Sequence, residues 1–203
     1  MATSVDICNQ ALAMLGDPAS VSSIDPPDGS PQAGHCSRWY PIALRRLLEE
    51  HAWSFATVKA TPSQLADEKL ETSGFQYAFA VPSQCIRILG VEDSTYHEPM
   101  EFIAMRRDNV PAILTNQPDP VMTYVTYVDS PAIFPNYFID ALVVRLAAYL
   151  VGPLRRSDAS SQTAVGLLKL YEQALSEAKT ADSLSGVRRQ DKYVAAQLRA
   201  RRV

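Results

Sequence analysis

Apolar residues recur at helical spacing near the N-terminus. They predict a first helix, capped by Thr3 or Ser4, and a second helix over 32–50. Pro41 supplies no backbone N–H, so we expect a kink or a restart there. Residues 17–31 are rich in Asp, Ser and Pro, and predict a loop between the two helices. The apolar positions of the first helix are Val5, Cys8, Leu12 and Leu15.

Helical patterns return in the last third of the chain. Residues 136–151 are apolar on nearly all sides, which is typical of a central buried helix, and Gly152-Pro153 should end it. A longer amphipathic helix should begin at a cap formed by Ser157 or Asp158. It should end near residue 181, because a break is expected over 183–186.

The middle of the chain has a different pattern, rich in β-branched and aromatic residues. No helical pattern of ten or more residues separates the extended runs, so antiparallel pairing is favoured. Trp53 and Phe55 should lie where this segment joins the helices. The predicted extended runs are 53–58, 75–81, 85–91, 100–105, 112–114 and 121–128.

Helices at both ends and strands between them indicate an α+β fold. The simplest packing is a helical bundle formed by the N- and C-terminal helices, with an inserted small antiparallel β subdomain and a C-terminal arm. The predicted segments are 1–51 (N-terminal helices of the bundle), 52–130 (inserted β subdomain), 131–186 (C-terminal helices of the bundle) and 187–203 (basic arm).

Composition agrees with a globular chain that can bury a core. Of the 203 residues 47% are hydrophobic and 20% charged, which excludes wholesale disorder. The three cysteines, Cys8, Cys36 and Cys85, are widely spaced, so we interpret them as buried small side chains rather than disulfides or zinc ligands. No signal peptide is recognised, and the apolar stretch 137–150 is too short and too charged to span a membrane. We expect folding in a reducing cytoplasm.

The formal net charge of −3 hides a strong asymmetry. Residues 187–203 contain six cations and one anion, a net charge of +5. The remaining 13 cations and 21 anions give residues 1–186 a net charge of −8. An acidic body therefore carries a basic tail.

Recognisable catalytic motifs are missing from the sequence. The eight glycines form no phosphate-binding loop, and neither G-x-S-x-G nor H-E-x-x-H occurs. His35 and Cys36 are sequence neighbours and would point in different directions on a helix. The sequence nominates no catalytic, cofactor-binding or metal-ligating residue, and we expect a protein that is not an enzyme.

The basic tail is the most informative segment for function. Tyr193, Ala196 or Gln197, and Ala200 could share one helical stripe among the cations. The tail could be a frayed terminus, or an arm that folds onto an acidic partner surface. The two interpretations are compatible, since an arm can be disordered alone and ordered when bound.

Several segments resemble, in order and spacing, the head-to-tail adaptor proteins of bacteriophages, of the tail tubular protein A type found in short-tailed phages. The resemblance covers about residues 4–186. Its residues are 6–16 (Asp-Ile-Cys-Asn-Gln-Ala-Leu-Ala-Met-Leu-Gly), Ile24, Asp25, Ala33, Cys36, Tyr40, Arg45, Leu47, Leu48, 53–56 (Trp-Ser-Phe-Ala), 77–79 (Tyr-Ala-Phe), Pro82, 85–87 (Cys-Ile-Arg), Gly90, Val91, Tyr171, Leu175, Ala178 and Asp182.

This resemblance implies a structural virion protein in the head–tail connector, present in the host cytoplasm during assembly. Such proteins form a dodecameric ring that docks under the portal protein, extends the DNA channel and offers a platform for the nozzle or next neck protein. The ring serves viral tail assembly and DNA ejection, and packaged DNA passes its lumen without sequence-specific binding. No membrane and no cofactor are implied. The arm would bind the portal through Arg188, Arg189, Lys192, Tyr193, Leu198, Arg199, Arg201 and Arg202.

The alternative is a small cytoplasmic DNA-binding factor with a basic C-terminal arm. Its binding would weaken steeply with salt, because each neutralised phosphate releases a counterion. A portal complex held partly by Tyr193 and Leu198 should be less sensitive to salt. The acidic body also disfavours the approach of DNA.

Overall fold

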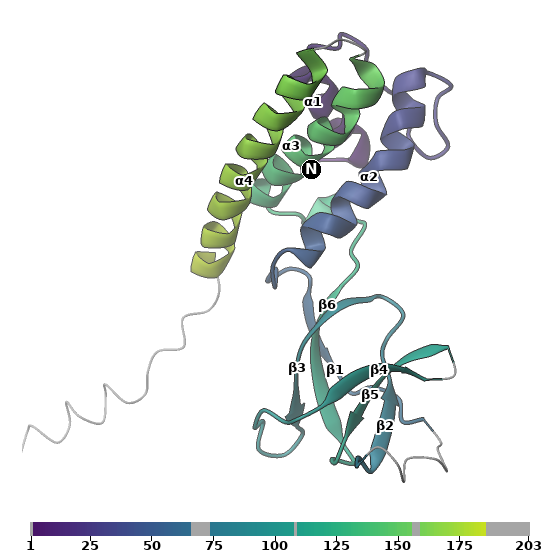
Figure 1. Cartoon of the computed structure of the whole chain (residues 1–203), viewed down its shortest axis with the longest axis vertical. Helices are drawn as coiled ribbons and strands as arrows, with labels where there is room; N and C mark the ends of the chain where they lie inside the picture. The colour runs from purple at the N-terminus through teal and green to yellow at the C-terminus, as the bar shows by residue number, and fades with distance from the viewer. Residues whose placement is uncertain (1, 66–73, 108, 156–158, 186–203) are drawn as a thin grey trace, which may run out of the picture.

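The computed structural model describes residues 2–65, 74–107, 109–155 and 159–185, with the side chains of 159–161 excepted. The described chain consists of a helical bundle and two small antiparallel sheets (Figure 1). The helices come from the two ends of the sequence and the strands from its middle. The predicted α+β fold is confirmed.

The bundle contains helices from both ends of the chain: α1 (Ser4–Met14), α2 (Pro31–Glu49), α3 (Asn136–Leu154) and α4 (Ala159–Ser185). Helix α3 packs against each of the other three, and in Figure 1 it lies between α2 and α4. By length and composition alone α3 could cross a membrane, but ten of its residues are buried inside the protein. Its apolar character is that of the central helix of a bundle.

Side-chain caps define the starts of the first two helices. The Thr3 hydroxyl accepts a hydrogen bond from Asp6 N at 3.1 Å, and the Asp6 carboxylate accepts one from Thr3 N at 2.9 Å. The Thr3 hydroxyl also donates to the Asp6 carboxylate at 2.8 Å. The bonds from Thr3 N and from the Thr3 hydroxyl lower the pKa of Asp6, because they favour its charged form. Ser30 caps α2 in the same way through Ala33 N. The predicted cap at Thr3 is confirmed.

Two predicted helix ends are wrong, and of the kink or restart expected at Pro41 the restart does not occur. Helix α2 runs through Pro41 as one helix, and its limits lie within one residue of the predicted 32–50. Helix α3 continues past Gly152-Pro153, and Arg155 N closes its last turn on the carbonyl of Val151. Helix α4 reaches Ser185, since its serines bond to carbonyls of the preceding turn instead of breaking the helix. The predicted cap at Ser157 or Asp158 lies outside the described residues.

The strands form two three-stranded sheets. One has the order β1–β6–β3 and the other β2–β5–β4, and every pair is antiparallel as predicted. Tyr124 lies opposite both Val58 and Ile88 in the first sheet. The strands are β1 (Thr57–Ala60), β2 (Tyr77–Ala80), β3 (Cys85–Asp93), β4 (Ile103–Arg107), β5 (Val110–Thr115) and β6 (Pro120–Thr126).

The predicted extended run over 53–58 is wrong in its first half. Strand β1 begins at Thr57, and residues 54–56 form a turn in which Ala56 N bonds to the carbonyl of Trp53. The aromatic residues that suggested a strand are used to fill the bundle core. Their β propensity is overridden by tertiary packing.

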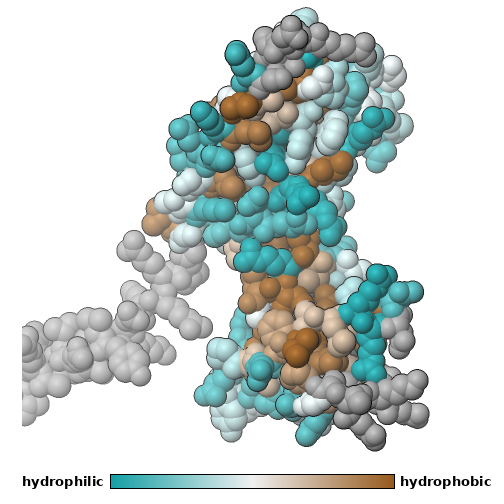
Figure 2. All heavy atoms as spheres, in the orientation of Figure 1, coloured by the Kyte–Doolittle hydropathy of each residue, from teal (hydrophilic) through white to brown (hydrophobic). Residues whose placement is uncertain are grey.

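Two apolar clusters stabilise the bundle and the strands. The larger lies inside the bundle and includes Trp53. The smaller joins both sheets and consists of Phe79, Val91, Ile113, Met122 and Tyr124. Figure 2 shows apolar side chains also gathered on the visible face where the bundle meets the strands. Cys8 and Cys36 are buried as predicted, whereas Cys85 is only half-buried.

Candidate functional site

The residues predicted to bind a partner lie outside the described residues. These are Arg188, Arg189, Lys192, Tyr193, Leu198, Arg199, Arg201 and Arg202. The structure therefore describes the end of α4, which the arm follows in the sequence, and pockets elsewhere on the molecule.

A buried carboxylate anchors the end of α4. Asp182 is 3% exposed, and its oxygens accept hydrogen bonds from Ser54 N at 3.1 Å, the Ser54 hydroxyl at 2.7 Å and the Tyr137 hydroxyl at 2.9 Å. His51 Nε2 lies 3.3 Å from the same carboxylate. Residues from α3, from α4 and from the turn between α2 and β1 thus meet at one side chain. We call this contact the Asp182 joint.

Trp53 lies beside the Asp182 joint and fixes the same turn. Its side chain is fully buried, and its Nε1 donates to the carbonyl of Leu47 at 2.8 Å. Its ring packs edge-on against Phe138, with the ring centres 5.0 Å apart. The predicted position of Trp53 between bundle and strands is confirmed, and Phe55, 4.8 Å from the Phe138 ring, lies there too.

Sequence reasoning matched Asp182 to a family pattern but gave it no role. The signal for its role was present, because Asp182 follows Tyr171 and Ala178 on the apolar stripe of the helix. A charged residue on such a stripe must be hydrogen-bonded when buried. Its partner Ser54 is 128 residues away in sequence, and no local pattern indicates that pairing.

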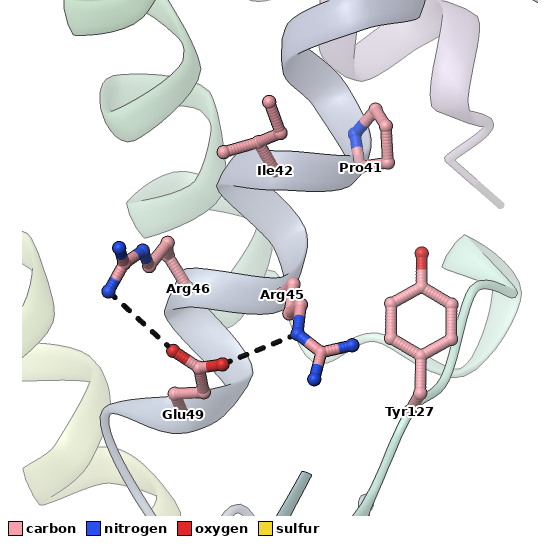
Figure 3. Close-up of a pocket in the computed structure, with 6 residues that line it drawn as sticks. All are labelled: Pro41, Ile42, Arg45, Arg46, Glu49 and Tyr127. Carbon is pink, nitrogen blue, oxygen red and sulfur yellow. Dashed lines mark ion pairs between the residues drawn. The ribbon is translucent and has the colours of Figure 1, made fainter. Parts of the chain in front are cut away.

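An open groove runs along the exposed side of α2 (Figure 3). It encloses about 540 Å³ between Pro41, Ile42, Arg45, Arg46 and Glu49 on α2 and Tyr127 after β6. Glu49 lies 3.4 Å from Arg45 and 3.8 Å from Arg46, and all three side chains contact water. Exposed pairs of this kind contribute little to folding. The arginines are therefore available to a partner.

The electrostatic surroundings of the groove differ from one wall to the other. Burial raises the pKa of Tyr127, Asp129 raises it further, and Arg45 acts in the opposite direction. The α2 wall combines Arg45 and Arg46, both paired with Glu49, with the exposed side chain of Ile42. Arginine beside apolar area is common in protein interfaces, so the groove suits a protein contact better than a small polar ligand.

Within 2–65, 74–107, 109–155 and 159–185, no three His, Cys, Asp or Glu side chains converge on a position for a metal ion. Comparison of the chain with protein-family models and with curated proteins finds no match.

Proposed function

We propose that this chain is a structural protein of a bacteriophage virion, a head-to-tail adaptor that forms a ring under the portal. The ring extends the DNA channel and presents a platform to the nozzle or next neck protein. The chain acts by binding other proteins and carries out no catalysis.

The observation that best supports the proposal is the Asp182 joint. The family resemblance is carried by short segments that are far apart in sequence, including 53–56 and Asp182. Ser54 of the first segment bonds directly to Asp182 of the second. This contact supports the proposal, because it gives two distant segments of the resemblance one structural role. It joins the turn before β1 to the end of α4, which the arm follows in the sequence.

The bundle has two different flanks, as a closed ring requires. A ring is built from head-to-tail contacts, in which one surface of a subunit meets a different surface of its neighbour. Helices α2 and α4 lie on either side of α3 (Figure 1). The α2 flank carries exposed Ile42 between charged residues, and the α4 flank carries exposed Leu168 and Leu170. Burial of this apolar area would favour contact between the two flanks.

The arm extends this proposal to the portal. It follows Ser185, whose turn is anchored through Asp182. In a ring each arm adds its contact to those of its neighbours, so weak individual contacts give tight overall binding.

The proposal is tested by sedimenting the purified chain with portal rings of the same phage over a range of salt. We expect co-sedimentation that changes little with salt, because apolar contacts contribute. Binding to duplex DNA that falls steeply with salt, without binding to portal rings, would instead support a DNA-binding factor.

A further inference from the structure

Strand β4 forms an exposed edge of the sheet β2–β5–β4. Residues 103–106 are all exposed, and of the residues that the structure describes, those of β5 alone pair with this strand. Other edge strands are covered by neighbouring segments. Leu65 N donates to the carbonyl of Ala78 in β2 at 2.8 Å, and Met100 N donates to that of Val91 in β3 at 2.9 Å. An edge without such cover can accept another strand.

The free side of β4 presents backbone donors and acceptors. Arg106 lies opposite Pro111, which has no N–H, and the carbonyl of Pro111 accepts a hydrogen bond from Val81 N at 2.8 Å, on the side of β2. Because backbone groups alternate in direction along an antiparallel strand, those of Arg106 and Ala104 point away from β5. A second strand can therefore bond to Ala104 and Arg106 without disturbing the sheet.

The face of the hairpin beside this edge is apolar. Ile103 and Met105 lie on one face of β4, and Val110, which is opposite Arg107, lies on the same face of β5. Their exposed fractions are 49% for Ile103, 46% for Met105 and 39% for Val110. Large apolar side chains that gather beside an open edge indicate a contact surface.

The residues along β4 fit a second copy of the same strand. In an antiparallel two-fold pair centred on Ala104, Ile103 lies opposite Met105 of the second copy, and Glu101 lies opposite Arg107 of the second copy. Each of these contacts occurs twice, and each joins an apolar residue to an apolar one or an acid to a base. Moving the centre by one residue places Ile103 opposite Arg107 in one direction, and Glu101 opposite Met105 in the other.

The two charges of this register can serve a contact between copies. Glu101 is exposed and makes no ion pair with the described residues. Arg107 takes part in an interaction within its own chain, and its guanidinium has several N–H donors, so it can also bind a carboxylate of the second copy. Within one copy, Glu101 and Arg107 are separated by about 20 Å of extended chain, so they do not satisfy each other.

We propose that the free edge of β4 docks on β4 of a second copy of this chain, in an antiparallel two-fold pair centred on Ala104. Strands of this length bury little area, so the dimer should be weak and should form at high concentration. A two-fold pair closes on itself, in contrast to the head-to-tail contacts of a ring. The inference concerns the free chain and does not rest on the proposed function.

Sedimentation equilibrium of the full chain tests the proposal, from micromolar to near-millimolar concentration. The wild type should show a concentration-dependent equilibrium between monomer and dimer. Glu101→Arg and Arg107→Glu each place like charges opposite each other at both ends of the pair, so each variant should dimerise about tenfold more weakly. The matched control Glu177→Arg reverses a charge on the exposed face of α4 and should dimerise like the wild type.

An equal mixture of the two charge variants tests the register directly. In the mixed pair each introduced charge faces an opposite charge of the other copy, so the mixture should recover the dimerisation that each variant alone has lost. A wild type that remains monomeric over the whole range would overturn the proposal. Dimerisation that both charge variants retain, or a mixture that remains monomeric, would also overturn it. No portal is present, so the outcome is independent of the adaptor proposal.

Ala104→Pro tests the backbone contact separately. Proline removes the N–H that points to the second copy, and edge strands tolerate proline where this N–H faces away from the sheet. We expect an unchanged urea midpoint and weaker dimerisation. The control Ala104→Ser keeps the N–H at the same exposed position and should dimerise like the wild type. Equal dimerisation of the proline variant and the wild type would contradict strand pairing at this edge.

Discussion

Asp182, on α4, connects this helix to two other segments of the chain. Its carboxylate accepts hydrogen bonds from the α2–β1 turn and from α3, and it faces His51. The charge is 3% exposed, so each of these bonds replaces a lost bond to water. One side chain thereby determines where α4 ends relative to the strands.

Replacing Asp182 with alanine should destabilise the protein. The Ser54 N–H, the Ser54 hydroxyl and the Tyr137 hydroxyl would lose their acceptor. We expect the free energy of unfolding to fall by about 2 kcal/mol. This is a small loss for three hydrogen bonds, because Ser54 and Tyr137 are partly exposed and can bond to water instead. Urea denaturation measures it. Ser183→Ala, one residue on, should have little effect, and equal stability of both variants would show that the joint has no energetic role.

Asp28 organises the loop before α2. Its carboxylate accepts hydrogen bonds from the backbone N–H and the hydroxyl of both Ser22 and Ser30. These bonds, with the Ser30 hydroxyl contributing most, hold the pKa of Asp28 well below its usual value of 3.8. The loop that begins α2 is thus stabilised by an ionised side chain.

The ionisation of Asp28 should contribute to the pH dependence of the protein's stability. Because the folded-state pKa is lowered, its contribution is present above pH 3.8 and is lost as the pH falls through the folded-state pKa. Asp28→Asn should therefore reduce the loss of stability on acidification, measured as the urea midpoint at neutral and at acid pH. Glu177→Gln, on the exposed face of α4, serves as the control. An identical acid response of Asp28→Asn and the wild type would contradict the assignment.

At the scale of elements, the sequence predicted the type of the described α-helices and strands better than their limits. The period of three to four along Val5, Cys8 and Leu12 reflects burial of one helix face, which is a local property. Helix ends depend on long-range contacts. Helix α4 continues to Ser185, and beside this end Asp182 bonds to Ser54, which is 128 residues away in sequence.

The division of the strands into two sheets was not predicted. Strands β1 and β6 are distant in sequence yet paired, and β3 carries two register shifts beside β6. Pairing of this kind is determined by which apolar faces meet, and alternation within a strand does not reveal it.

The strand segment begins and ends at neighbouring points of the structure, next to Ala56 and at Thr126. Thr126 N donates to the carbonyl of Ala56 at 2.8 Å, so a short Gly-Ser linker can replace residues 57–126. We expect the shortened chain to keep its helical circular dichroism and to unfold cooperatively. Its stability should be lower than that of the intact chain, because Ile86 and Leu89 no longer pack against the bundle. Gradual, non-cooperative unfolding would indicate that the bundle needs the strands.

At the scale of the whole molecule, we propose that the folded body provides the stability of the protein and that the basic arm binds the portal. Among the residues that the structure describes, the two apolar clusters lie between Ala2 and Ala178. Deleting 187–203 should therefore change the free energy of unfolding by less than about 1 kcal/mol. The same deletion should abolish co-purification with portal rings. A second variant, in which the six cations of the arm are changed to glutamine, keeps the length of the arm and tests the effect of its charge alone. Normal co-purification of the truncated chain would contradict a portal-binding arm.

Negative-stain electron microscopy of the purified chain mixed with portal rings of its phage tests the adaptor proposal most directly. The proposal predicts an added ring of density at the base of each portal, with twelve subunits and an open central channel. Portals that remain unchanged at saturating concentrations of the intact, folded chain would contradict it.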